Sequence, residues 1–193
     1  RGGTTTVVGM PRMDSQVTLP GFPMFYDEKK ILGCMYGSAQ GRRDFPRFPE
    51  TPTVLDRLVS AGKMVYSVGK IDDIFGHRGI SVSNHTTSNQ DSTAAMIQSL
   101  AEDFEGLLFV NLIEYDMIYG HRNDPAGYAR ALEDFDQSLT ALIDSMKPDD
   151  MLMISADHGV DPTTESTDHS REYVPLVVFT RQKQANIELG VRK

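Results

Sequence analysis

The fold is decided by one stretch of sequence, Leu107-Leu108-Phe109-Val110-Asn111-Leu112-Ile113. Every residue in it except Asn111 is apolar, and apolar and polar positions do not alternate. A strand of this kind is covered on both faces, which is typical of parallel strands in α/β proteins. The stretch therefore predicts a buried, parallel strand at the centre of a sheet.

Upstream of this strand, the sequence predicts a helix, a strand and a second helix. Thr51 is a candidate helix cap with Pro52 at the first helical position, and an apolar stripe follows until Gly62 ends the helix. Residues 63–68 have the composition of a strand. After a polar, glycine-containing loop, we expect the second helix over about residues 93–104.

Downstream, the pattern of alternating elements continues. Asp124 and Pro125 form a cap-plus-proline start, and apolar residues then recur at helical spacing from Tyr128 to Met146. Residues 151–155 and 173–180 are expected to be two further buried strands. This order predicts an α/β fold with a mostly parallel sheet and flanking helices.

The first fifty residues differ from the rest. A strand candidate over residues 5–10 precedes a proline-rich stretch, and residues 26–36 have mixed helix and strand character. Chain breakers then gather between Pro46 and Pro52, which indicates a boundary. We therefore expect a short strand/helix segment over residues 1–50, followed by a main domain over residues 51–193.

Composition limits the classes of function. The chain has 193 residues and a formal net charge of -8, which disfavours nucleic acid and anionic membranes as partners. No apolar run approaches the length of a membrane span and no signal sequence is evident, so we expect a soluble, cytoplasmic protein. The single cysteine, Cys34, excludes an internal disulfide and a cysteine-based zinc site. Any bound metal must therefore use histidine and carboxylate ligands.

Three of the five histidines lie beside predicted strand ends, each close to an aspartate. The pairs are Asp116 and His121, Asp157 and His158, and Asp168 and His169. Loops at the carboxyl ends of parallel strands converge, and carboxylate oxygen with neutral imidazole suits manganese or zinc. Because Asp157 and His158 are adjacent, they could face two metals about 4 Å apart, an arrangement used in phosphoryl transfer. The alternative is that each histidine only caps a loop or packs on the surface.

Four segments resemble, in order and spacing, motifs of the phosphopentomutases, which are enzymes of the alkaline-phosphatase superfamily. They are Val68–Phe75, Asn111–Arg122, Ser155–Gly159 and Thr167–Pro175, within a similarity that runs from about Pro52 to Thr180. Cofactor-independent phosphoglycerate mutases share the Asp-His-Gly motif but not the first segment. The resemblance implies part of an alkaline-phosphatase-like core.

Carried over by position, the resemblance implies two metal sites. Asp116, His121 and His169 would hold one divalent metal, and Asp157 with His158 would hold the second. The metal in this family is usually manganese.

The resemblance also implies a substrate and a reaction. Lys70 and Arg122 would contact a sugar phosphate, and Arg171 would orient the ligand loop; the alternative for each is a solvated charge. In the family, a phosphorylated threonine exchanges phosphoryl groups with a pentose phosphate, which interconverts ribose 1-phosphate and ribose 5-phosphate.

The chain departs from the family pattern in several places. No residue matches the nucleophilic threonine or the additional metal-binding aspartate of the family's first strand, and Val160 replaces an expected asparagine. We therefore expect fewer ligands for the second metal and impaired mutase activity. A non-catalytic metal-binding scaffold and a residual metal-dependent phosphatase are the alternatives.

Residues 1 to about 48 resemble a different family. Three segments are similar to the coenzyme domain of zinc-dependent medium-chain alcohol dehydrogenases: Arg1–Pro11, Val17–Pro20 and Asp27–Ser38. The glycine-rich dinucleotide turn and the catalytic zinc ligands of that family are missing, so no nicotinamide binding is expected. We expect Cys34 to be a small buried residue and not a ligand.

Overall fold

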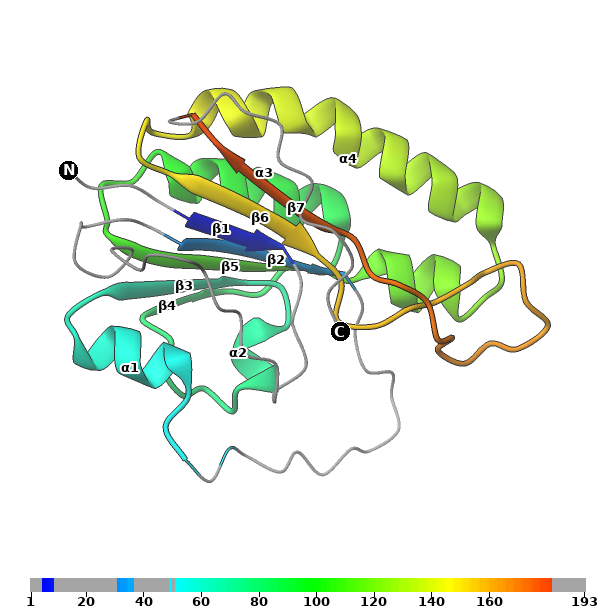
Figure 1. Ribbon diagram of the computed structural model, residues 1–193, viewed down its shortest axis with the longest axis horizontal. Coiled ribbons are helices and arrows are strands. Elements are labelled where there is room, and N and C mark those ends of the chain that lie inside the picture. The colour runs from blue at the N-terminus through cyan, green and yellow to red at the C-terminus, as the bar shows by residue number, and fades with distance from the viewer. Residues whose placement is uncertain (1–4, 9–30, 37–48, 50, 182–193) are drawn as a thin grey trace.

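The computed structural model describes residues 5–8, 31–36, 49 and 51–181, and Figure 1 shows their arrangement as one sheet with helices on both faces. The strands are β1 (Thr5–Val8), β2 (Ile31–Tyr36), β3 (Met64–Val68), β4 (Val82–Asn84), β5 (Gly106–Leu112), β6 (Met151–Ser155) and β7 (Leu176–Thr180). The helices are α1 (Val54–Ser60), α2 (Ile71–Ile74), α3 (Asn89–Leu100), the π-helix η1 (Tyr115–Gly120) and α4 (Pro125–Ser145). The proline-rich stretch, residues 26–30 and most of the expected domain boundary lie outside the described residues.

The strand order of the sheet is β4-β3-β5-β1-β2-β6-β7. All described pairs are parallel except β6 with β7, which confirms the predicted mostly parallel α/β sheet. β1 and β2 lie between β5 and β6, and each pairs with both of them. Because β3, β5 and β6 run in the same direction, the loops that follow them meet at one edge of the sheet.

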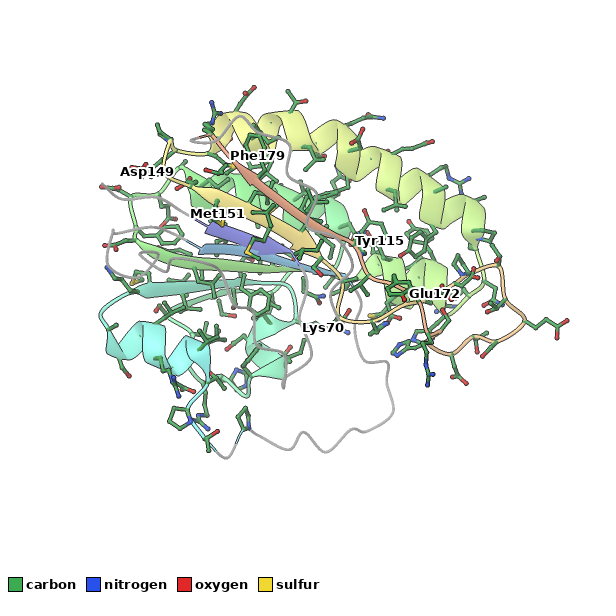
Figure 2. All side chains as sticks on the ribbon, in the orientation of Figure 1. Lys70, Tyr115, Asp149, Met151, Glu172 and Phe179 are labelled. Carbon is green, nitrogen blue, oxygen red and sulfur yellow. The ribbon has the colours of Figure 1, made fainter. Side chains whose placement is uncertain are left out.

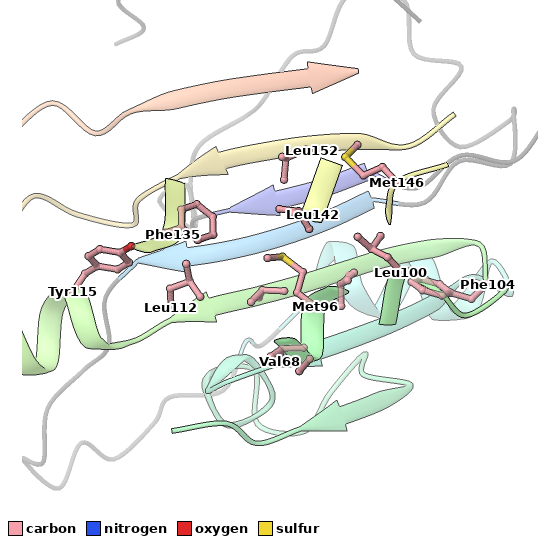
Figure 3. Packing of buried hydrophobic residues seen from close by; sticks show 13 residues of the cluster. Val68, Met96, Leu100, Phe104, Leu112, Tyr115, Phe135, Leu142, Met146 and Leu152 are labelled. Carbon is pink, nitrogen blue, oxygen red and sulfur yellow. The ribbon is translucent and has the colours of Figure 1, made fainter. Parts of the chain in front are cut away.

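β5 is the centre of the core, as its apolar sequence predicts, and all of its residues are buried. Leu108, Val110 and Leu112 face the cluster formed with α3 and α4, which Figure 3 shows. Leu107 and Phe109 face the opposite cluster, which contains residues of α1 and α2. Burial of each such side chain stabilises the fold by about 1.5–3 kcal/mol. The strand therefore ties both helical layers to the sheet and fixes where its carboxyl end emerges.

The first helix begins later than the sequence predicts. Thr53, and not Thr51, caps α1: its Oγ1 accepts a hydrogen bond from the Asp56 N–H at 3.3 Å, and the Thr53 N–H donates to Asp56 Oδ2 at 2.7 Å. This reciprocal capping box satisfies two backbone groups, which a cap at Thr51 would not. The buried stripe is also narrower than expected, because it contains Leu55 and Leu58 but not the neighbouring valines.

The second helix begins earlier than predicted, at Asn89, and ends at Leu100. Ser88 caps it by accepting a hydrogen bond from the Asp91 N–H at 3.0 Å. The polar stretch before it, expected to be a loop, contains α2 and β4. Elements of four and three residues are too short to show a hydrophobic period, so the sequence could not reveal them.

α4 follows the prediction closely. Asp124 accepts a hydrogen bond from the Gly127 N–H at 2.8 Å, Pro125 occupies the first turn, and the helix ends before Met146. No helix in the described part of the chain, α4 included, combines the length and the apolarity that a membrane crossing requires.

The strand β7 differs from the buried strand that was expected over residues 173–180. It begins at Leu176 instead of residue 173, pairs antiparallel to β6, and is exposed rather than buried. Among the described strands it is the last of the sheet and pairs with β6 alone, and Leu176, Val177 and Val178 are exposed along it. Antiparallel edge strands tolerate such exposure, whereas central parallel strands do not.

Candidate metal centre

A π-helix places the first two candidate ligands together. η1 follows β5, and the His121 N–H donates to the Asp116 carbonyl at 2.9 Å, which is the five-residue bond of a π-helix. In an α-helix, residues five apart are rotated by about 140°. The wider turn brings them onto one face, and His121 Nε2 lies 3.1 Å from Asp116 Oδ1.

Packing against α4 holds η1 in place. The Tyr115 side chain is buried, its O–H donates to the Ala131 carbonyl at 2.9 Å, and its ring lies 5.4 Å from that of Tyr128. Gly120 lies against Val160, where a Cβ would approach a valine methyl to 2.7 Å. The position of Asp116 is therefore set by contacts on both sides of the turn.

The loops after β6 and before β7 complete the cluster. His169 Nε2 lies 3.3 Å from Asp116 Oδ1, and the His169 ring stacks on His158 with centroids 3.6 Å apart. Asp116, His158 and His169 each offer one ligand atom, all within 4.8 Å of one another. Two ligands at 2.1 Å from one tetrahedral cation would lie about 3.4 Å apart. The group that is close enough to share one cation thus contains His158 in place of His121, which the resemblance assigns to the first metal.

In two of the imidazoles, the Nδ1 atom contacts a backbone carbonyl. His121 Nδ1 contacts the Thr167 carbonyl, and His158 Nδ1 donates to the Gly159 carbonyl at 3.2 Å. A carbonyl accepts only from N–H, so the neutral tautomer that fits these contacts has its proton on Nδ1 and leaves Nε2 as the ligand atom. Metal-binding histidines show the same arrangement.

The electrostatics of the cluster also suit a cation. Burial, and then the neighbouring His158, lower the pKa of His169, which favours neutral imidazole. Burial raises the pKa of the Asp157 carboxyl to about 6, and its Oδ1 has no hydrogen-bond partner among the described residues. A divalent cation would stabilise both the buried carboxylate and the adjacent neutral rings.

The remaining predicted residues lie on the elements that carry or adjoin the cluster. Lys70 Nζ donates to Met117 Sδ of η1 at 3.1 Å, and Figure 2 places Lys70 at the carboxyl edge of the sheet. Arg122 and Arg171 are exposed, each within two residues of a clustered histidine. Asp168, whose adjacency to His169 suggested the site, is exposed.

The sequence did not predict the contact between the loop that carries His158 and the segment that carries His169. An isolated bridge joins Gly159 to Ser170, with the Ser170 N–H donating to the Gly159 carbonyl at 3.1 Å. This bridge sets the spacing of His158 and His169. The glycine after Asp157 and His158 was the available signal, because a close backbone approach requires a residue without Cβ.

Replacing Gly159 with alanine is expected to weaken metal binding by roughly 10-fold or more, as the loss of a supporting group does. The added Cβ would lie 2.6 Å from the Ser170 carbonyl oxygen and 2.7 Å from the Glu172 nitrogen, so the two loops must separate. Calorimetric titration with Mn²⁺ measures the effect. Glu165→Ala, in the exposed part of the same loop, is the control and should bind as the wild type does. Equal affinities for both variants would contradict this role of the bridge.

A second prediction concerns pH. Because folding raises the Asp157 pKa from 3.8 to about 6, its contribution to the free energy of unfolding is fully present below pH 3.8 and is lost as the pH rises through 6. In EDTA, Asp157→Asn should therefore be more stable than the wild type above pH 7, by about 3 kcal/mol, with no advantage near pH 4. Urea unfolding at both pH values tests this. A pH-independent difference would show that the carboxyl titrates normally.

Comparisons with known proteins place the chain among metalloenzymes. A family model described as the metalloenzyme superfamily matches residues 13–193. The chain is 60% identical over 152 residues to a phosphopentomutase of Herpetosiphon aurantiacus, which covers 79% of this chain and 39% of the relative. It is 50% identical over 157 residues to a phosphopentomutase of Acetivibrio thermocellus, covering 81% and 40% respectively. The chain thus spans about two fifths of the length of these relatives.

Among solved structures, the chain is similar to the phosphoglycerate mutase of Leishmania mexicana. The TM-score is 0.54 at 18% identity, over 67% of this chain and 32% of the other, which supports the same fold. The comparisons lend no support to the alcohol-dehydrogenase resemblance of residues 1 to 48, and the family model begins within that stretch.

Proposed function

The chain belongs to the metalloenzyme superfamily, and on this premise we propose that it forms the metal-binding part of a phosphopentomutase-type enzyme. The reaction would interconvert ribose 1-phosphate and ribose 5-phosphate. One observation carries the proposal: Asp116, His121, His158 and His169 converge in a chain that is up to 60% identical to phosphopentomutases.

The residues are proposed to hold two divalent cations, with manganese as the expected metal. Asp116, His121 and His169 form the first site, and Asp157 with His158 forms the second. The stacking of His158 on His169 supports close spacing of the two sites. When bound, the cations would neutralise charge on the transferring phosphoryl group and activate a hydroxyl nucleophile.

The substrate is proposed to be a pentose phosphate, held by basic side chains at the same edge of the sheet. A net charge of -8 repels phosphate, so local cations must offset it. Lys70, which lies against η1, is the best-supported contact, and Arg122 and Arg171 flank clustered histidines. We propose the cytoplasm as the location, which agrees with a chain whose single cysteine cannot form an internal disulfide.

A residual metal-dependent phosphatase is the second candidate function. Transfer of the phosphoryl group to water instead of a threonine would give phosphatase activity without mutase activity. A chain that binds metal but turns over neither substrate would instead be a scaffold.

The test uses the full chain with Mn²⁺. Formation of ribose 1-phosphate from ribose 5-phosphate is measured beside hydrolysis of a generic phosphomonoester, and His169→Ala is the metal-site control. Conversion of the pentose phosphate that is lost in the control supports the mutase proposal. Hydrolysis alone identifies the phosphatase, and metal binding with neither reaction identifies the scaffold.

A further inference from the structure

The loop between β6 and β7 carries candidate ligands near both of its ends, His158 at the start and His169 towards the end. Its middle part is folded on itself: the Thr164 N–H donates to the Asp161 carbonyl at 3.3 Å, and Thr164 Oγ1 donates to the same carbonyl at 3.0 Å. Bonds of this kind fix the local shape of the loop but not its place on the protein. The position of His169 therefore depends on contacts from other elements.

The turn between η1 and α4 contacts this loop through two side chains. Asn123 Nδ2 donates to the Thr164 carbonyl at 2.6 Å, and His121 Nδ1 contacts the Thr167 carbonyl. The loop therefore runs along the turn, and Figure 1 shows it beside the start of α4. His121 is itself a candidate ligand, whereas Asn123 is not. Asn123 is thus the contact that can be changed without removing a ligand from the cluster.

The backbone conformation of Asn123 explains only part of the choice of this residue. Asn123 has a positive φ of 50°, and its N–H donates to the carbonyl of Gly120, the last residue of η1, at 3.1 Å. Glycine and asparagine are the residues that most readily adopt this conformation after a helix. A glycine would serve the turn equally well, so the turn does not account for the amide that bonds to Thr164.

The bond between Asn123 and Thr164 is placed where it can hold the loop. Both residues are partly buried, so water competes less for the bond than it does at the surface. Asn123 Oδ1 is buried and has no hydrogen-bond partner among the described residues. The reverse orientation of the amide would set this oxygen against the Thr164 carbonyl, where two acceptors repel. The bond to Thr164 therefore fixes the orientation of the amide.

We propose that Asn123 is a positioning residue of the candidate metal centre. By holding Thr164, it keeps the second half of the loop against the end of η1, with His169 Nε2 3.3 Å from Asp116 Oδ1. A cation then meets a ligand that is already in place, so its binding does not have to order the loop. The inference rests on the proposed function, because it assumes that the cluster binds a metal.

The experiment compares the full chain with Asn123→Gly and Asn123→Asp. Both replacements suit a positive φ, and neither can donate to the Thr164 carbonyl. Glycine adds flexibility and aspartate adds negative charge, so an effect that both variants share reports the lost bond. Calorimetric titration with Mn²⁺ should show an affinity about 10-fold lower in each. Thr163→Ala is the control and should bind as the wild type does, because it removes only a bond to Asp161 within the loop.

A measurement without metal separates positioning from a role in stability. In EDTA, the Ser170 N–H, which bonds to the Gly159 carbonyl, should exchange with solvent roughly 10-fold faster in both variants, because the loop opens more often. The ring signals of His169 in NMR spectra should shift. Urea unfolding in EDTA should stay close to that of the wild type, since the bond lies outside the two buried clusters of the core.

Wild-type affinity or wild-type amide exchange in Asn123→Gly would overturn the proposal, whatever the effect on stability. A loss of affinity in only one of the two variants would also overturn it, because flexibility or charge would then explain the loss. A wild type that binds no Mn²⁺ would contradict the proposed function. Faster exchange in both variants would in that case still support Asn123 as the residue that holds the loop.

Discussion

Replacing Asp116 with asparagine is expected to weaken Mn²⁺ binding by more than about 100-fold. Asp116 Oδ1 is the atom that both His121 and His169 approach, at 3.1 and 3.3 Å, and the residue is fully buried. The substitution keeps the side-chain volume but removes the negative charge at the centre of the site. Loss of a ligand should exceed the 10- to 100-fold effect of losing a group that only supports one.

The control for this variant is Asp134→Asn, which removes an exposed carboxylate of α4 and equally lowers the net negative charge. Isothermal titration with Mn²⁺ should give wild-type affinity for the control. Unfolding in EDTA shows whether Asp116→Asn is folded, and the isosteric substitution should leave it so. Wild-type affinity in folded Asp116→Asn would remove Asp116 from the metal site.

Replacing Gly106 with alanine is expected to destabilise the chain by more than about 4 kcal/mol, beyond the usual range for a single substitution. Gly106 begins β5 with φ of +153°, and an added Cβ would lie 1.8 Å from the Met64 carbonyl oxygen. That oxygen belongs to the paired backbone of β3, so no side-chain rotation relieves the overlap. The first residue of the central strand would have to leave the sheet.

Gly62→Ala is the control, because it measures the cost of replacing a glycine of positive φ where no atom overlaps the new Cβ. Gly62 has φ of +74° but nothing within 4 Å of its added Cβ, so only the backbone preference changes. Its expected cost is about 1–2 kcal/mol. Urea unfolding of both variants measures the difference. Similar destabilisation of the two would show that the approach of Met64 does not constrain β5.

The sequence predicted the parts of the fold in which a single pattern extends far enough to be distinctive. The continuous apolar run of β5 identified a buried central strand, and α4 combined a cap, a proline and a long apolar stripe. Where two signals competed, the sequence was less decisive. Thr51 and Thr53 both suit a helix cap, and only the pair of hydrogen bonds between Thr53 and Asp56 distinguishes them.

For the candidate site, the sequence indicated which residues gather but not how. Parallel strands bring their following loops together, so Asp116, His121 and His169 could be expected at one edge of the sheet. The π-turn of η1 and the stacking of His158 on His169 depend on packing between distant segments, which local sequence does not encode. The strand β4 was missed for a different reason, because three residues are too few to show a hydrophobic period.

The most direct test of the metal centre is an anomalous difference map from crystals of the chain grown with Mn²⁺. The arrangement of ligands predicts a peak about 2.0–2.2 Å from Asp116 Oδ1 and from Nε2 of His121 and His169. A manganese peak of full occupancy elsewhere in the map, with no peak near these three atoms, would contradict the metal centre on which the proposed function rests.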